Sequence, residues 1–131
     1  KHKTAYEIGV RLVGSEMCIR DSHIAVRKNI YDLVKRAIKN KKGKKITVEI
    51  DNLNQLKKIN GLKFNRILFD NMSLKNLRKA INISKRFYET EASGGITLKN
   101  VRRIAATGVN RVSIGQITHS APVVDFKINF Y

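Results

Sequence analysis

The fold is decided by residues 46–70, ITVEIDNLNQLKKINGLKFNRILFD. The stretch opens with a β-branched run that closes on Glu49, continues with leucine and isoleucine at helical spacing, and ends in a second β-like run that closes on Asp70. A third run closes on Glu91, and the three carboxylates are spaced 21 positions apart. Strands that alternate with helical segments predict a parallel sheet covered by helices. We therefore expect an α/β protein with a carboxylate where each strand ends.

The same pattern extends along the chain in both directions. Asp51 or Asn52, Ser73 and Thr97 are candidate N-caps for three of the expected helices. The expected elements are helices from 26 to 38, 53 to 59, 74 to 81 and 98 to 105, and strands at 46–50, 66–69, 87–91, 110–114 and 123–130. A complete (β/α)₈ barrel takes about 250 residues. We expect a partial barrel of the TIM-like type, its C-terminal portion only, with the carboxylates on the catalytic rim.

The beginning of the chain reads differently. Residues 12–21, LVGSEMCIRD, are what the codons CTC GTG GGC TCG GAG ATG TGT ATA AGA GAC encode, and this string resembles a transposon-type sequencing adapter. Residues 1–7 are similar to the translated flow-cell primer that precedes such adapters. We interpret residues 1–22 as an adapter-derived artefact and residues 23–131 as the domain, the alternative being a genuine N-terminal segment. Because Cys18 falls in the first part, the domain offers no thiol nucleophile and no cysteine metal site.

The formal net charge of +17 raises the question of nucleic acid. Lysines crowd residues 35–45, whereas most other basic residues fall on the polar faces of separate predicted helices. Solvated helix surfaces, together with a coding sequence rich in A and T, account for this pattern, so we expect no nucleic-acid partner, although a basic rim would steer anionic substrates. No apolar run reaches the about 20 residues that a membrane-spanning helix needs. The expectation is a cytoplasmic protein without a membrane contact.

The strand-end carboxylates suggest chemistry at the rim. Glu49 and Asp70 can bind Mg²⁺, accept hydrogen bonds from sugar hydroxyls or stabilise a cationic transition state. The alternative to a functional role is that both carboxylates only form salt bridges with the many lysines. Glu91 can do the same or anchor a turn, and Asn71 can orient Asp70.

Two glycine turns follow strands in the same frame. Gly94 and Gly95 lie between a strand and an expected helix N-terminus, where free N–H groups and the helix dipole suit a phosphate, and Ser93 adds a hydroxyl donor. Gly115 and His119 belong to the next such loop, and barrel phosphate sites commonly use the loops after the last two strands. An ordinary βα turn and a structural histidine are the alternatives.

Five motifs along the chain occur in the same order as in a known enzyme family. They are VEIDNL at 48–53, LFDNM at 68–72, EASGGIT at 91–97, TGV at 107–109 and GQITHS at 115–120. Together they resemble quinolinate phosphoribosyltransferase, also called carboxylating nicotinate-nucleotide pyrophosphorylase, from His23 to the end of the chain.

The resemblance implies a pentosyltransferase. Such an enzyme joins quinolinate to 5-phosphoribosyl-1-pyrophosphate with Mg²⁺ and releases pyrophosphate and carbon dioxide, which yields nicotinate mononucleotide for NAD synthesis. It implies that Glu49 and Asp70 face the ribose and its developing oxocarbenium charge. It also implies that the 5′-phosphate is held by Ser93, Gly94, Gly95, Gly115 and His119. Members form homodimers in which one subunit completes the other's site.

The differences from the family's sequence pattern limit the activity expected of this chain. Its N-terminal domain and first barrel strands, which bind the quinolinate carboxylates, are absent; Arg20, Asp21 and Ser22 stand where the family has Lys-Asp-Asn, and Gln116 replaces the usual Ala. An open half-barrel is expected to leave sheet edges and apolar faces unpaired, so we expect this chain alone to be inactive. A related barrel phosphoribosyltransferase acting on another base, or a basic nucleic-acid-binding module, remain the alternatives.

Overall fold

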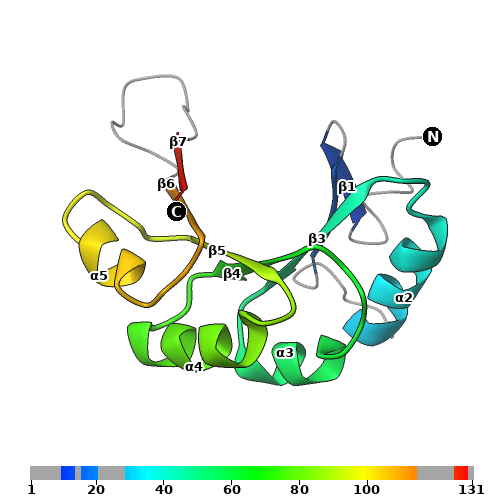
Figure 1. Ribbon diagram of the computed structural model, residues 1–131, viewed down its shortest axis with the longest axis horizontal. Coiled ribbons are helices and arrows are strands. Elements are labelled where there is room, and N and C mark those ends of the chain that lie inside the picture. The colour runs from blue at the N-terminus through cyan, green and yellow to red at the C-terminus, as the bar shows by residue number, and fades with distance from the viewer. Residues whose placement is uncertain (1–9, 14–15, 21–28, 115–125, 130–131) are drawn as a thin grey trace.

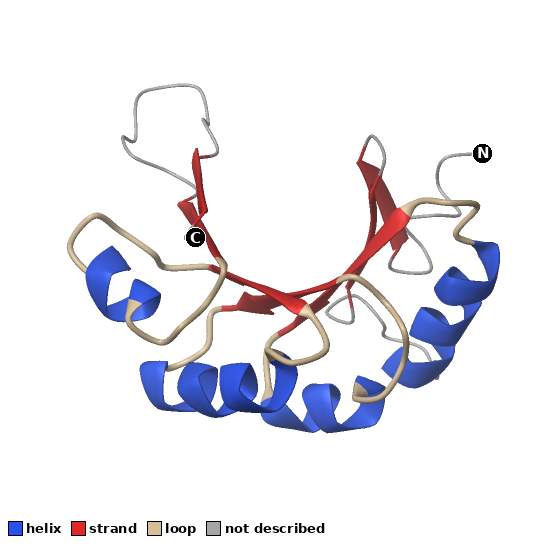
Figure 2. Ribbon diagram, in the orientation of Figure 1, coloured by secondary structure: helices blue, strands red, loops and turns tan. Residues whose placement is uncertain are grey.

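One curved sheet with helices on its outer side forms the architecture (Figures 1 and 2). The computed structural model describes residues 10–13, 16–20, 29–114 and 126–129. Within them seven strands lie side by side in chain order, with β2 to β6 parallel and the edge strands β1 and β7 antiparallel to their neighbours. The strands are β1 (Val10–Val13), β2 (Glu16–Arg20), β3 (Lys45–Ile50), β4 (Arg66–Asp70), β5 (Glu89–Ser93), β6 (Arg111–Ile114) and β7 (Phe126–Asn129).

Four described helices connect the parallel strands: α2 (Ile30–Asn40), α3 (Leu53–Ile59), α4 (Leu74–Ser84) and α5 (Val101–Ala105). Three of them begin at a side-chain cap that satisfies a free backbone N–H. The Asn52 side chain accepts from Gln55 N, and Ser73 accepts from Asn76 N. The choice left open between Asp51 and Asn52 is thus settled for Asn52, and α2 is capped by Asn29.

The hydrophobic core lies between the outer face of the sheet and the helices. Alternate residues of β3 (Ile46, Val48 and Ile50) are almost completely buried, as are Ile67 and Phe69 of β4. The helices contribute Leu33, Val34, Leu56, Ile59, Leu77 and Ile81 to the same cluster. Because successive side chains in a strand point to opposite faces, the residues between them point to the inner face of the curve.

That inner face is polar, which corrects the expectation of an unpaired apolar face. Its positions in β4 are Arg66, Leu68 and Asp70, and those in β5 are Glu89, Glu91 and Ser93. Arginine and glutamate pair with one another across the strands there. The expectation of open edges holds within the described part of the chain, since β1 and β7 each have one strand neighbour.

Four predicted elements begin later than expected. The helix expected from 26 begins at Ile30, because Asn29 is its extended N-cap, and the strand expected from 110 begins at Arg111. Residues 87–88 do not start a strand, because Phe87 N and Tyr88 N both donate to Ser84 O and complete the turn that ends α4. The strand ladder begins at Glu89, whose N–H donates to Asn65 O. Thr97 does not cap a helix from 98, because Asn100 Oδ1 accepts from Thr97 N and closes a turn before α5 starts at Val101.

The last predicted strand is shorter than 123–130 and runs from Phe126 to Asn129, antiparallel to β6. In the part of the chain that the structure describes, every helix is too short or too polar to cross a membrane.

Candidate functional site at the strand ends

Three polar side chains meet at the carboxyl ends of neighbouring parallel strands. Glu49 is the last residue but one of β3, Asp70 ends β4 and Ser93 ends β5. Asp70 lies opposite Ser93 in the strand register, and Ser93 Oγ donates a hydrogen bond to Asp70 Oδ1 at 3.3 Å. The Glu49 carboxyl group lies near that of Asp70, which raises the pKa of Glu49. Parallel pairing alone therefore brings these residues together from strands that are far apart in sequence.

A cation bridges the two carboxylates. Arg20, at the end of β2, places Nε 3.3 Å from Glu49 Oε1 and Nη2 3.9 Å from Asp70 Oδ2. The register places Arg20 directly opposite Glu49. Setting residues 1–22 aside misses Arg20, whereas the alternation of Glu16, Cys18 and Arg20 on one face of β2 is the signal that finds it.

Opposing effects act on the ionisation of Glu49. Burial is the largest effect and raises the pKa of its carboxyl group, because only 14% of the side chain is exposed. The Arg20 guanidinium lowers that pKa, whereas the neighbouring Asp70 carboxyl raises it. The net pKa lies above the ordinary value. The site thus holds a desolvated carboxyl group whose ionised form is disfavoured by burial and by Asp70 and favoured by Arg20.

The glycine turn after β5 approaches β4 closely. Gly94 has φ +80°, and a Cβ on it would lie 2.7 Å from Asp70 Oδ1 and 2.8 Å from Asn71 N. Asn71 N donates to Ser93 O, which ties the two loops together. Gly95 also has a positive φ. Glycine is therefore required at position 94 both for backbone conformation and for contact with the carboxylate.

The helix dipole does not act on this turn in the way that the sequence suggested. α5 spans five residues and begins at Val101, beyond a turn in which Asn100 Nδ2 donates to Gly95 O at 2.9 Å. The turn can still supply its own N–H groups and the Ser93 hydroxyl to an anion. Gly115 and His119 lie outside the described residues.

Glu91 does not close a strand, and that prediction is wrong. It lies in the middle of β5, is only 4% exposed and points into the inner face below the rim. Arg66 Nη1 lies 3.4 Å from Glu91 Oε2, and Ser113 Oγ donates to Glu91 Oε1. Its partners make it a structural anchor of the inner face.

Arg66 organises the inner-face ion-pair cluster, which the sequence analysis missed. The residue is 3% exposed and contacts Glu16 at 3.2 Å and Glu89 at 3.0 Å besides Glu91. Arg111 Nε contacts the second oxygen of Glu89 at 2.7 Å. The sequence signal for this cluster is the position of Arg66 at the start of β4, on the same face as Leu68 and Asp70.

The comparisons with known proteins agree with this architecture. The family model described as "Quinolinate phosphoribosyl transferase, C-terminal domain" matches residues 10–129. The chain is 34% identical over 113 residues to the probable carboxylating nicotinate-nucleotide pyrophosphorylase of Bacillus subtilis, which covers 85% of this chain and 39% of that protein. It is 30% identical over 129 residues to the chloroplastic enzyme of that name from Oryza sativa, covering 84% of this chain and 35% of that protein.

Solved structures give the same picture. The nicotinate-nucleotide pyrophosphorylase of Francisella tularensis superposes with a TM-score of 0.70 at 30% identity, covering 81% of this chain and 38% of that one. The corresponding protein of Ehrlichia chaffeensis superposes with a TM-score of 0.63 at 38% identity, covering 70% and 34%. The chain thus spans less than two fifths of the length of these four proteins, at most 39%. On the extent of the family match, this chain belongs to the quinolinate phosphoribosyl transferase family, within its C-terminal domain.

Proposed function

We propose that the complete protein transfers phosphoribosyl from 5-phosphoribosyl-1-pyrophosphate to quinolinate with decarboxylation, giving nicotinate mononucleotide for NAD synthesis. Membership of the family supports the reaction, as do relatives named "Quinolinate phosphoribosyltransferase [decarboxylating]". The observation that carries the proposal within this chain is the pair of carboxyl groups of Glu49 and Asp70 at the carboxyl ends of β3 and β4, which lie close enough for one guanidinium to contact both. That end of a parallel β/α sheet is where barrel enzymes place their catalytic groups.

The chemical role of the pair follows from the charge that forms on the ribose. As the bond from C1 to pyrophosphate lengthens, positive charge develops on the ring, and two fixed carboxylates beside it stabilise that charge more than the neutral ground state. Glu49 and Asp70 are the catalytic residues in this proposal. Arg20 contacts both carboxylates in this chain, but it lies within the residues proposed below as adapter-derived and has no assigned role in the complete protein.

The phosphate of the substrate would be held by the turn after β5. Ser93 supplies a hydroxyl and Gly94 and Gly95 supply N–H groups in positive-φ conformations, an arrangement that suits anions. Gly115 and His119 are proposed as further ligands of the same phosphate, on the loop after β6.

Mg²⁺ is proposed to enter with the pyrophosphate. Among the described residues there is no group of three or more His, Cys, Asp or Glu side chains suited to a metal ion. Mg²⁺ is commonly held by one or two carboxylates together with substrate phosphates, and the adjacent Glu49 and Asp70 fit that mode. The metal would neutralise charge on the leaving pyrophosphate.

Further proposals concern what surrounds this chain. We propose that residues 23–131 are the C-terminal part of the barrel domain, that residues 1–22 are adapter-derived, and that the complete protein is a cytoplasmic homodimer or higher oligomer. We expect that the 131-residue chain by itself does not form product, because it spans less than two fifths of the length of the relatives that it matches.

The test is to recover the unbroken gene and assay the full-length product for quinolinate-dependent formation of nicotinate mononucleotide. We expect Glu49→Gln and Asp70→Asn each to lower kcat by about 10²-fold or more, as removal of a transition-state electrostatic group does. Asp32→Asn, which alters an exposed carboxylate in the first turn of α2, serves as the matched control. A full-length enzyme that uses a different base, or one whose two rim variants keep normal kcat, would overturn the proposal.

A further inference from the structure

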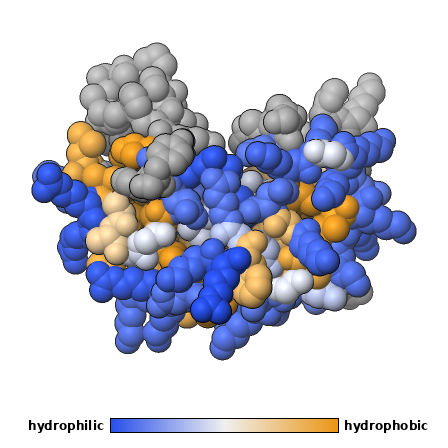
Figure 3. Space-filling view, in the orientation of Figure 1, coloured by the Kyte–Doolittle hydropathy of each residue, from blue (hydrophilic) through white to orange (hydrophobic). Residues whose placement is uncertain are grey.

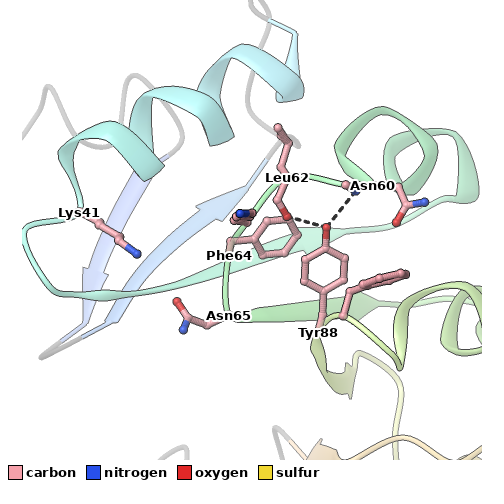
Figure 4. Close-up of a pocket in the computed structure, with 9 residues that line it drawn as sticks. Lys41, Asn60, Leu62, Phe64, Asn65 and Tyr88 are labelled. Atoms are coloured by element: carbon pink, nitrogen blue, oxygen red, sulfur yellow. Dashed lines mark hydrogen bonds between the residues drawn. The ribbon is translucent and has the colours of Figure 1, made fainter.

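A pocket lies at the opposite end of the strands from Glu49 and Asp70. It is formed by the connections that precede β4 and β5, together with the end of α2, and has a volume of about 580 Å³. That volume falls in the range of small-molecule sites. Its lining is drawn in Figure 4 and consists of Lys41, Asn60, Gly61, Leu62, Lys63, Phe64, Asn65, Phe87 and Tyr88.

The wall of the pocket is a fixed aromatic stack. The rings of Phe64 and Tyr88 lie 4.2 Å apart at 15°, and both residues are buried. The Tyr88 hydroxyl donates to Leu62 O at 2.7 Å and accepts from Gly61 N at 3.1 Å, as the dashed lines in Figure 4 show. These contacts hold the wall in place before any ligand binds.

One aromatic ring of the pocket faces solvent. Phe87 is 69% exposed and meets Tyr88 edge-on, with ring centroids 6.3 Å apart at 61°. The Phe87 ring is not part of the buried core cluster, to which its neighbour Tyr88 belongs. An exposed phenyl beside a preformed pocket offers a face on which a planar group can stack.

The lining is basic and contains no acidic residue. Lys41 and Lys63 are both exposed, and Lys41 follows α2 within the lysine-rich segment 39–45. Glu89 is the carboxylate nearest to this wall in sequence, and it is already paired with Arg66 and Arg111. The charge of the pocket therefore favours an anion.

We propose that this pocket binds a nucleotide, with the base stacked on Phe87 and the phosphate contacted by Lys41 and Lys63. An aromatic face with adjacent cations is the combination that recognises nucleotides without reading their sequence. The nucleotide can be free or one unit of a single strand. The site is separate from the rim, so its test does not depend on the proposed reaction.

The experiment is calorimetric titration of the folded 131-residue chain with AMP and with inorganic phosphate, and fluorescence anisotropy with a labelled octauridylate at 50 and 200 mM salt. The variants are Phe87→Ala, Phe87→Leu and the pair Lys41→Ala with Lys63→Ala. The matched controls are Leu98→Ala, whose side chain is 71% exposed, and Lys75→Ala with Lys79→Ala on α4. Circular dichroism confirms that each variant is folded.

We expect AMP to bind and both the Phe87 variants and the lysine pair to weaken binding about five-fold or more, with the controls unchanged. Octauridylate that binds at least ten-fold more tightly than AMP, with a steep salt dependence, identifies a single strand as the source; comparable affinities identify a free nucleotide. The proposal is overturned if neither probe binds at millimolar concentration, if phosphate binds as tightly as AMP, or if the control lysine pair weakens binding equally.

Discussion

The inner-face ion-pair cluster should be the most sensitive polar feature of the fold. Arg66 is almost completely buried and is the only cation within 4 Å of the Glu91 carboxylate in the described residues. Glu16 and Glu89, its other partners, expose 30% and 35% of their side chains and can be solvated when the arginine is removed. We therefore predict that Arg66→Met destabilises the chain chiefly by leaving Glu91 charged and buried.

The magnitude follows from that burial. Removing one partner of a buried ion pair costs about 3–5 kcal/mol, because the remaining charge keeps its desolvation penalty. Against a total stability of about 5–15 kcal/mol for a domain, this is a large fraction. With a urea m-value of about 2 kcal/mol per molar, the unfolding midpoint should fall by about 1.5–2.5 M.

The assay is urea unfolding followed by circular dichroism for wild type, Arg66→Met and the control Arg78→Met, which removes an exposed arginine of α4. The double variant Arg66→Met with Glu91→Gln should recover part of the loss, because it replaces the buried charge by a neutral amide. A loss below about 1 kcal/mol for Arg66→Met, or no difference from Arg78→Met, would refute the reasoning.

Three further predictions concern the rim and the pocket. Glu49→Gln should stabilise the chain more at pH 7 than at acidic pH. Burial raises the pKa of Glu49, so the wild-type chain is stabilised as the pH falls through that raised value and loses this contribution as the pH rises. Equal effects of the substitution on urea unfolding at both pH values would contradict this prediction. Gly94→Ala should lower the thermal unfolding midpoint more than Gly108→Ala. Both glycines have positive φ, but only at position 94 would a Cβ lie 2.7 Å from Asp70 Oδ1 and 2.8 Å from a backbone nitrogen. Equal shifts of the midpoint would contradict the steric argument. Tyr88→Phe should cost about 1–3 kcal/mol in urea unfolding, because the Gly61 N–H and the carbonyls of Leu62 and Ile59 lose their hydroxyl partner.

Much of the fold was accessible from the sequence because its signals are local. Apolar spacing and the caps Asn52 and Ser73 located α3 and α4, and β-branched runs located β3 and β4. The errors occur where short-range hydrogen bonds compete with the pattern. Phe87 satisfies a strand propensity but completes a helix-ending turn, and the amide of Asn100, rather than Thr97, organises the turn before α5.

The polar inner face could not be predicted by composition, because an arginine and a glutamate are individually typical of solvated surfaces. In Figure 3 hydrophilic residues cover the outer side of α3 and α4, where such side chains meet water. Arg66 and Glu91 are instead buried. Their burial is possible because the two side chains pair with each other across adjacent strands, although they are 25 positions apart in sequence. Only the three-dimensional register supplies that information.

Register also explains why three equally spaced carboxylates do not form one site. Glu49 lies opposite Leu68, and Leu68 lies opposite Glu91, so these residues share one row across the sheet. Asp70 is two residues further along β4 and pairs with Ser93 in the next row. Equal intervals in sequence therefore do not place the three carboxylates in one row, because the strand pairing sets the row of each residue. Asp70 and Ser93 therefore lie at the rim, Glu49 reaches Asp70 from the row below, and Glu91 remains inside with Arg66.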